Sequence, residues 1–114
     1  MSYKVITVDA LKGDIAPVHL RMLLHELGRR EWPRPEWARA HPFQKIALYN
    51  SYVDVQIIDG KDLPKGIDFK GQVPMTFGGI PLKVDSDMRD DVIKFYQGTE
   101  LVGRIFNLAK PPGL

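Results

Sequence analysis

The fold depends most on residues 15–30, which read IAPVHLRMLLHELGRR. At 100° per residue, the apolar side chains of this stretch gather in one stripe: Ala16, Leu20, Leu23, Leu24 and Leu27. Pro17 falls in the first helical turn, where its missing N–H breaks no helical hydrogen bond. Asp14 can cap the helix by accepting hydrogen bonds from backbone N–H groups. The sequence therefore predicts an amphipathic helix over residues 15–30 that packs on a core.

Short apolar runs separated by turn signals surround this helix. Before it, residues 3–8 are rich in β-branched side chains and predict a strand. After it, the turn signals at 78–79 and 97–99 predict two hairpins. Their strands are expected at 73–77 with 80–84, and at 92–96 with 101–106.

The middle of the chain is read as a mixture of helical turns and one strand. A brief helical turn is expected over Glu36–Ala40, after the prolines at 33 and 35 have ended the main helix. Residues 43–48 read as a second helical turn, and the apolar run at 52–58 reads as a strand. We place the boundary between the last two near Asn50.

Together these elements predict an α+β domain, with one main amphipathic helix packed on a small, mainly antiparallel sheet of about five strands. The 114 residues suffice for one modest core. We expect a single domain over residues 1–114. Within it, residues 1–45 are helical and basic, 46–109 are rich in strands, and 110–114 form an extended tail.

Composition excludes several classes of site. The chain has no cysteine, which excludes disulfides, thiolate metal sites and a cysteine nucleophile. Its amino terminus lacks a basic, apolar signal segment, and no apolar run is long enough to span a bilayer. A soluble location, inside a cell or in a virion, is expected, with no membrane partner.

Catalytic motifs are missing from the sequence. His19 and His25 lie six residues apart on the predicted helix, roughly 240° around it, so they cannot share a metal. His41 has no partner that spacing identifies. No serine stands in a Gly-x-Ser-x-Gly elbow, and no glycine-rich phosphate loop occurs. We therefore expect no catalytic residue, no cofactor and no enzymatic activity.

The acidic run at residues 85–91, DSDMRDD, opens like a calcium-binding loop. Its sixth position is Asp90 where glycine makes the turn, and its twelfth is Tyr96 where a glutamate belongs. A solvated turn without metal is therefore expected. If a metal bound here, its first ligands would be Asp85, Asp87 and Asp91.

Uneven charge is the clearest functional signal. Residues 21–45 hold six basic and three acidic side chains, a local +3, whereas residues 46–114 hold eight basic and nine acidic ones, a local −1. Arginine and tryptophan together are typical of protein-interface hot spots. They are also typical of nucleic-acid binding, in which arginine contacts the phosphate backbone and tryptophan stacks on a base. The predicted contact residues are Arg29, Arg30, Trp32, Arg34, Trp37 and Arg39. A third interpretation is structural, with the tryptophans closing the core and the arginines solvated.

A second feature lies on the helix away from its leucine stripe. Val18, Met22, His25 and Arg29 follow one another at spacings of four, three and four, which makes a narrow, partly apolar seam. The seam either packs under the later strands or meets another chain as a helix in a groove. We expect burial within the domain.

One stretch resembles a known family. Residues 77–88, FGGIPLKVDSDM, followed by VIKF at 92–95, resemble a late segment of the major capsid and related head proteins of tailed bacteriophages. In that segment an aromatic-Gly-Ile-Pro-Val-like strand runs into an Asp-x-Asp-Met/Leu turn and another strand. Arg89 stands where such segments often carry proline. The resemblance covers residues 77–95 and implies a phage-type small protein that works by binding or assembly, with no catalytic residue to carry over.

The sequence thus predicts a non-enzymatic, phage-type small protein that acts by protein–protein binding in virion or head assembly. Its partner would be another copy of itself, or another virion or host protein. Two alternatives stay open, a nucleic-acid-binding accessory protein and a phage inhibitor of a host enzyme.

Overall fold

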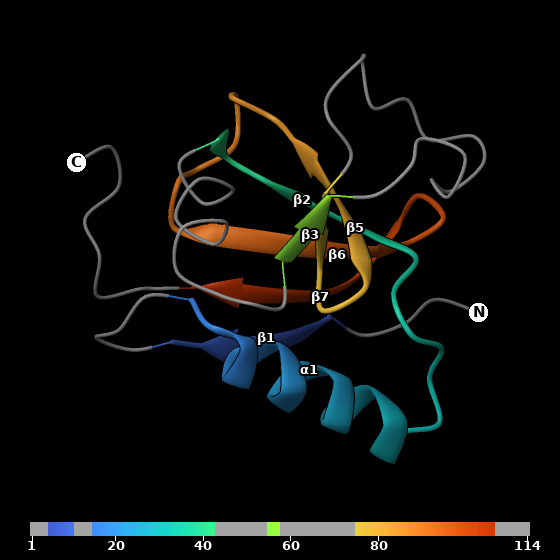
Figure 1. The fold of residues 1–114 in the computed structure, drawn as a ribbon. Coiled ribbons are helices and arrows are strands. Elements are labelled where there is room, and N and C mark those ends of the chain that lie inside the picture. The colour runs from blue at the N-terminus through green and yellow to red at the C-terminus, as the bar shows by residue number, and fades with distance from the viewer. Residues whose placement is uncertain (1–4, 11–14, 43–54, 58–74, 107–114) are drawn as a thin grey trace.

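The computed structural model describes residues 5–10, 15–42, 55–57 and 75–106. In this part of the chain, one helix lies against a seven-stranded sheet (Figure 1). The elements are β1 (Ile6–Asp9), α1 (Pro17–Arg29), β2 (Trp37–Ala40), β3 (Val55–Ile57), β4 (Met75–Phe77), β5 (Ile80–Val84), β6 (Val92–Gln97) and β7 (Glu100–Phe106). The expected strand at 3–8 is found as β1, and the one at 52–58 as β3. The helical turn at 43–48 and the tail at 110–114 lie outside the described residues.

The sheet is mixed, with strand order β1-β7-β6-β2-β5-β4-β3. β1 runs parallel to β7, and β2 runs parallel to β5, while the other neighbouring strands are antiparallel. The α+β class agrees with the prediction, but a mainly antiparallel sheet of about five strands is wrong. The reason is that β1 and β2 join strands far away in sequence, and no local turn signal reports such pairings.

The helix α1 confirms the main sequence prediction with small differences at its ends. Leu20, Leu23 and Leu27 are buried, and Leu24 is partly buried and packs against the core. The helix begins at Pro17, so the N-cap position is Ala16 rather than the predicted Asp14, which lies outside the described residues. In place of a capping carboxylate, the Nδ1 atom of His19 accepts a hydrogen bond from the Ala16 N–H at 2.9 Å.

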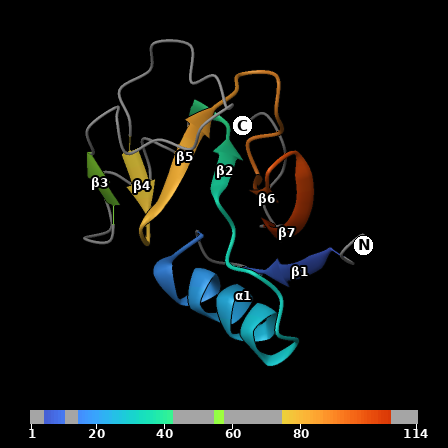
Figure 2. The same ribbon diagram turned by 90° about the vertical axis from the view of Figure 1, so that its right-hand side faces the viewer.

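Two glycines allow the helix to approach the sheet closely. A Cβ atom on Gly103 in β7 would lie 2.7 Å from the Cδ1 atom of Leu23. Gly78 has a φ of +59° in the turn between β4 and β5, and a Cβ atom there would overlap the side chain of Leu20. Figure 2 shows the resulting arrangement, in which the sheet curves around one side of α1.

The two predicted hairpins are confirmed in the part of them that is described. β4 and β5 are joined by Gly78-Gly79, and β6 and β7 by Gly98-Thr99. The helical turn expected over Glu36–Ala40 is wrong, because residues 37–40 form β2. This strand lies between β5 and β6 and pairs with both of them. Pairing on two sides outweighs the intrinsic helical preference of alanine and arginine.

Alternation along the strands gives the sheet two different faces. The face toward α1 carries the apolar core, including Val8, Ala38, Leu82, Ile93 and Ile105. Residues between these positions point to the other face, which therefore carries Thr7, Arg39, Lys83, Lys94 and Arg104.

Candidate functional site

The end of α1 is closed by a reversal of the chain that places Trp32. Glu31 has a φ of +58°, and its N–H donates to the Gly28 carbonyl, while the Trp32 N–H donates to the Leu27 carbonyl at 2.9 Å. This pair of bonds is the Schellman motif, which is usually completed by a hydrophobic contact from the residue that follows the left-handed one. Trp32 makes that contact by packing against the core.

The helix-end arginines are held by one carboxylate. Arg29 donates to Glu26 through Nη2 at 2.9 Å, and Arg30 Nε lies 3.8 Å from the same Oε2 atom. The Arg30 guanidinium also lies 5.2 Å from the centroid of the Trp32 ring. Both arginines are exposed, and such surface pairs contribute little to stability.

We expect Glu26 to titrate below its ordinary range. The hydrogen bond from Arg29 lowers the pKa of Glu26, and the charges of Arg29, Arg30 and His25 lower it further. A carboxyl whose folded pKa is depressed stabilises the fold above its unfolded pKa, and this contribution is lost as the pH falls through the folded pKa. NMR titration of the Glu26 side chain should show the lowered pKa. Arg29→Ala should raise it, and an unchanged pKa in this variant would contradict the pairing.

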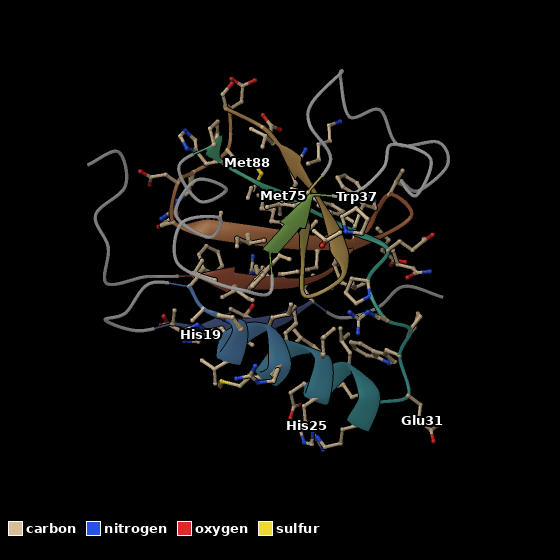
Figure 3. The ribbon with its side chains drawn as sticks, in the orientation of Figure 1. His19, His25, Glu31, Trp37, Met75 and Met88 are labelled. Atoms are coloured by element: carbon tan, nitrogen blue, oxygen red, sulfur yellow. The ribbon has the colours of Figure 1, made fainter. Side chains whose placement is uncertain are left out.

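The next two predicted contact residues have structural partners. Arg34 donates from Nη2 to the Gly78 carbonyl at 2.5 Å, so it ties the proline segment to the β4–β5 turn. Trp37 is buried, its Nε1 donates to the Gly98 carbonyl at 2.6 Å, and its ring stacks on Tyr96 with the centroids 4.5 Å apart. Figure 3 shows Trp37 over the strands, whereas Glu31 points away from the molecule. Trp37 therefore belongs to the interior, as the structural interpretation expected.

Arg39 lies away from the helix end, in the middle of the sheet. Its Nη2 donates to the Tyr96 hydroxyl at 2.8 Å, and its Nη1 lies 3.4 Å from Asp85 Oδ2. Its Nε is buried and has no hydrogen-bond partner among the described residues. The six predicted residues thus do not form one surface. Arg29, Arg30 and Trp32 lie at the end of α1, and Arg34 reaches the β4–β5 turn, whereas Arg39 belongs to the opposite face of the sheet.

On that face, Arg39 is one member of a row of four cations. The register pairs Lys83 of β5 with Arg39 of β2, Arg39 with Lys94 of β6, and Lys94 with Arg104 of β7. We call these four residues the cationic row. Neighbouring strands are about 4.8 Å apart, so the cationic row is about 14 Å long. Sequence reasoning missed three of them, although each stands between apolar or small residues in its strand, as alternation requires.

A hollow of about 400 Å³ opens over part of the cationic row. Its lining residues are Arg39, Asp85, Asp87, Met88, Arg89, Val92, Lys94, Arg104 and Phe106. Arg89 is held by the buried carboxylate of Asp91, with Nη2 and Oδ2 2.6 Å apart. The guanidinium carbons of Arg104 and Arg89 lie 5.2 and 6.0 Å from the centroid of the Phe106 ring.

The acidic turn at 85–91 is tied to its own backbone and to arginines. Asp85 Oδ1 accepts the Asp87 N–H at 2.9 Å, and the Asp85 carbonyl accepts the Met88 N–H. Asp85 and Asp91 each face an arginine, as described above. Within the described residues, no three His, Asp or Glu side chains are grouped to hold a metal ion.

Another surface lies at the edge of the sheet. Three large apolar side chains are exposed among the described residues: Val5 at 39%, Val18 at 46% and Met22 at 51%. Val5 precedes the edge strand β1, and the other two lie on α1, which packs beside it (Figure 1). A largely apolar groove of about 410 Å³ runs between the two elements and includes Met22 and His25. The expected burial of the helix seam is therefore wrong, because α1 turns only its leucine stripe to the sheet.

Comparison with models of known protein families, with curated proteins and with solved structures gave no match. No helix among the described residues is long and apolar enough to cross a membrane.

Proposed function

We propose that this protein is a non-enzymatic, phage-type assembly protein that binds a second copy of itself along β1 and α1. The observation that carries the proposal is the position of the exposed apolar side chains. Val5, Val18 and Met22 all lie at this edge, and they are the exposed large apolar side chains of the described residues. Exposed apolar groups gathered in one place favour an interaction site.

The edge strand itself supports this proposal. Within the described part of the chain, β1 pairs with β7 on one side and with no strand on the other. Natural edge strands are usually protected by lysine, proline or a bulge, and the sequence of β1, ITVD, has neither lysine nor proline. An unprotected edge offers its backbone groups to another extended strand.

A second copy supplies what this edge needs. An antiparallel pairing of β1 with β1 of the other copy, around a twofold axis perpendicular to the sheet, extends the sheet across the interface. The same axis brings the two α1 helices together on one face of the sheet. Met22 and Val18 of each copy are then covered by the other helix, so strand pairing and apolar burial are satisfied together.

The phage-type part of the proposal rests on residues 77–95, whose resemblance to phage head proteins implies assembly. They comprise the last residue of β4, the whole of β5 and the first part of β6, with the connections between them. A gene neighbourhood containing portal, scaffold or capsid genes would support this part, and a neighbourhood without phage genes would count against it.

Met22→Glu tests the self-association. Burying a methionine side chain contributes about 1.5–3 kcal/mol, and each 1.4 kcal/mol is a factor of ten in affinity. We expect the variant to weaken dimerisation about 10- to 100-fold in size-exclusion chromatography with light scattering. Arg21→Glu is the matched control, because it places the same carboxylate one residue away on α1, outside the groove. A wild-type protein that stays monomeric at every concentration would overturn the proposal.

A further inference from the structure

Nothing in the described residues shows that the cationic row stabilises the fold. Like charges directly opposite one another on neighbouring strands repel. In this row, four cations stand side by side on β5, β2, β6 and β7. Within the part of the chain that the structure describes, Arg39 is the one member of the four that faces a carboxylate, that of Asp85. The side chains of Lys83 and Lys94 have neither an ion pair nor a hydrogen bond among the described residues.

Two members of the row, Arg39 and Arg104, are held in place by their neighbours. Arg104 Nε donates to Thr7 Oγ1 at 2.9 Å, so β1 orients this guanidinium. Arg39 is fixed between Tyr96 and Asp85. Among the described residues, the row thus holds four cations, two of them oriented by the protein, against the single carboxylate of Asp85, and this excess of positive charge suits an anion from outside the chain.

The hollow adds an aromatic surface to this charge. Phe106 is partly exposed, and the guanidinium groups of Arg89 and Arg104 lie near its ring. Arg89 is oriented by the buried Asp91, so its position over the ring is set by the protein. Proteins that bind single-stranded nucleic acids combine a basic track for the phosphates with aromatic rings on which bases stack.

We propose that the sheet face opposite α1 binds single-stranded nucleic acid, with phosphates along the cationic row and a base against Phe106. A duplex is disfavoured because the major groove admits a helix or a two-stranded ribbon, and α1 lies on the other side of the sheet. This surface is separate from the outer edge of β1. Experiments can therefore contradict nucleic-acid binding without contradicting self-association, and the reverse. The sequence had placed its candidate nucleic-acid contacts at the end of α1 instead.

Fluorescence anisotropy with a labelled single-stranded oligothymidylate tests this proposal. Four phosphates neutralised by the row give a salt slope of about −2.8, so affinity should fall about 50-fold between about 50 and 200 mM salt. Lys94→Glu should weaken binding at least about tenfold. Lys94→Gln should reduce the salt slope by about 0.7, since one phosphate contact is lost.

Matched variants distinguish contact with the cationic row from an effect of the protein's net charge. Arg21→Glu changes the net charge as Lys94→Glu does, but on α1, and it should leave the affinity within about twofold of wild type. Phe106→Leu should weaken binding about tenfold with the salt slope unchanged, because stacking is lost while the charges remain. Circular dichroism of each variant checks that the fold is retained.

Four outcomes would overturn the proposal. The first is equal loss of binding in Lys94→Glu and Arg21→Glu. The second is loss in Arg30→Glu but not in Lys94→Glu, which would return the site to the end of α1. The third is tighter binding of a duplex of the same sequence. The fourth is binding of a labelled polyglutamate peptide without binding of the oligonucleotide, which would identify an acidic protein as the partner.

Discussion

Leu23→Ala is expected to lower the free energy of unfolding by about 3–5 kcal/mol, one of the two largest effects that we predict. Leu23 is fully buried on α1, and its methyl groups meet the backbone of β7 at Gly103. Truncation leaves a cavity between the helix and a strand that cannot move closer without breaking the sheet. Because a domain of this size has about 5–15 kcal/mol of stability, the variant should be close to unfolding.

Urea denaturation followed by circular dichroism measures this loss. Leu24→Ala is the matched control, because it removes the same atoms from the next residue of the helix, which is only partly buried. The control should lose about 1 kcal/mol, mainly from the reduced burial of apolar surface. Equal losses in the two variants would contradict the helix orientation described above.

Trp37→Ala is expected to lower the free energy of unfolding by a similar amount, about 3–5 kcal/mol. Trp37 is 7% exposed, stacks on Tyr96 and donates its indole N–H to the Gly98 carbonyl. Trp37→Phe keeps most of the stacking and loses the hydrogen bond, so its loss should be about 1–2 kcal/mol. Thermal and urea unfolding of both variants give these values.

This series also decides between the two roles that the sequence left open for Trp37. An interior tryptophan gives a graded loss of stability from wild type through phenylalanine to alanine. A tryptophan that serves mainly to contact a partner would leave the unfolding free energy nearly unchanged in both variants. The second result would contradict the structural role.

Much of the local structure followed from patterns of neighbouring residues. The leucine spacing predicted α1 and its buried face, and the glycine turns predicted both hairpins. The failures share one cause. β2 was read as a helical turn because its sequence WARA has no strong strand preference, and its extended form depends on β5 and β6 at its two sides.

The sequence likewise showed some parts of the candidate site and not others. The arginines and tryptophans near the end of α1 were visible as a local excess of charge. In the structure, Arg29 and Arg30 face Glu26, and Trp37 lies in the interior. The cationic row was not visible, because its four members come from separate strands and stand one to a strand. The seam of α1 was visible as a pattern, but the sequence did not show that it is exposed.

The sequence by itself determined the helix, its leucine stripe and the two hairpins, because helical periodicity and turn preferences act between residues close together in the chain. The tertiary structure alone decided which strands lie side by side, and therefore which surfaces exist. Strand order and register depend on contacts between distant segments. Lys83, Arg39, Lys94 and Arg104 become one row only because β5, β2, β6 and β7 align in register.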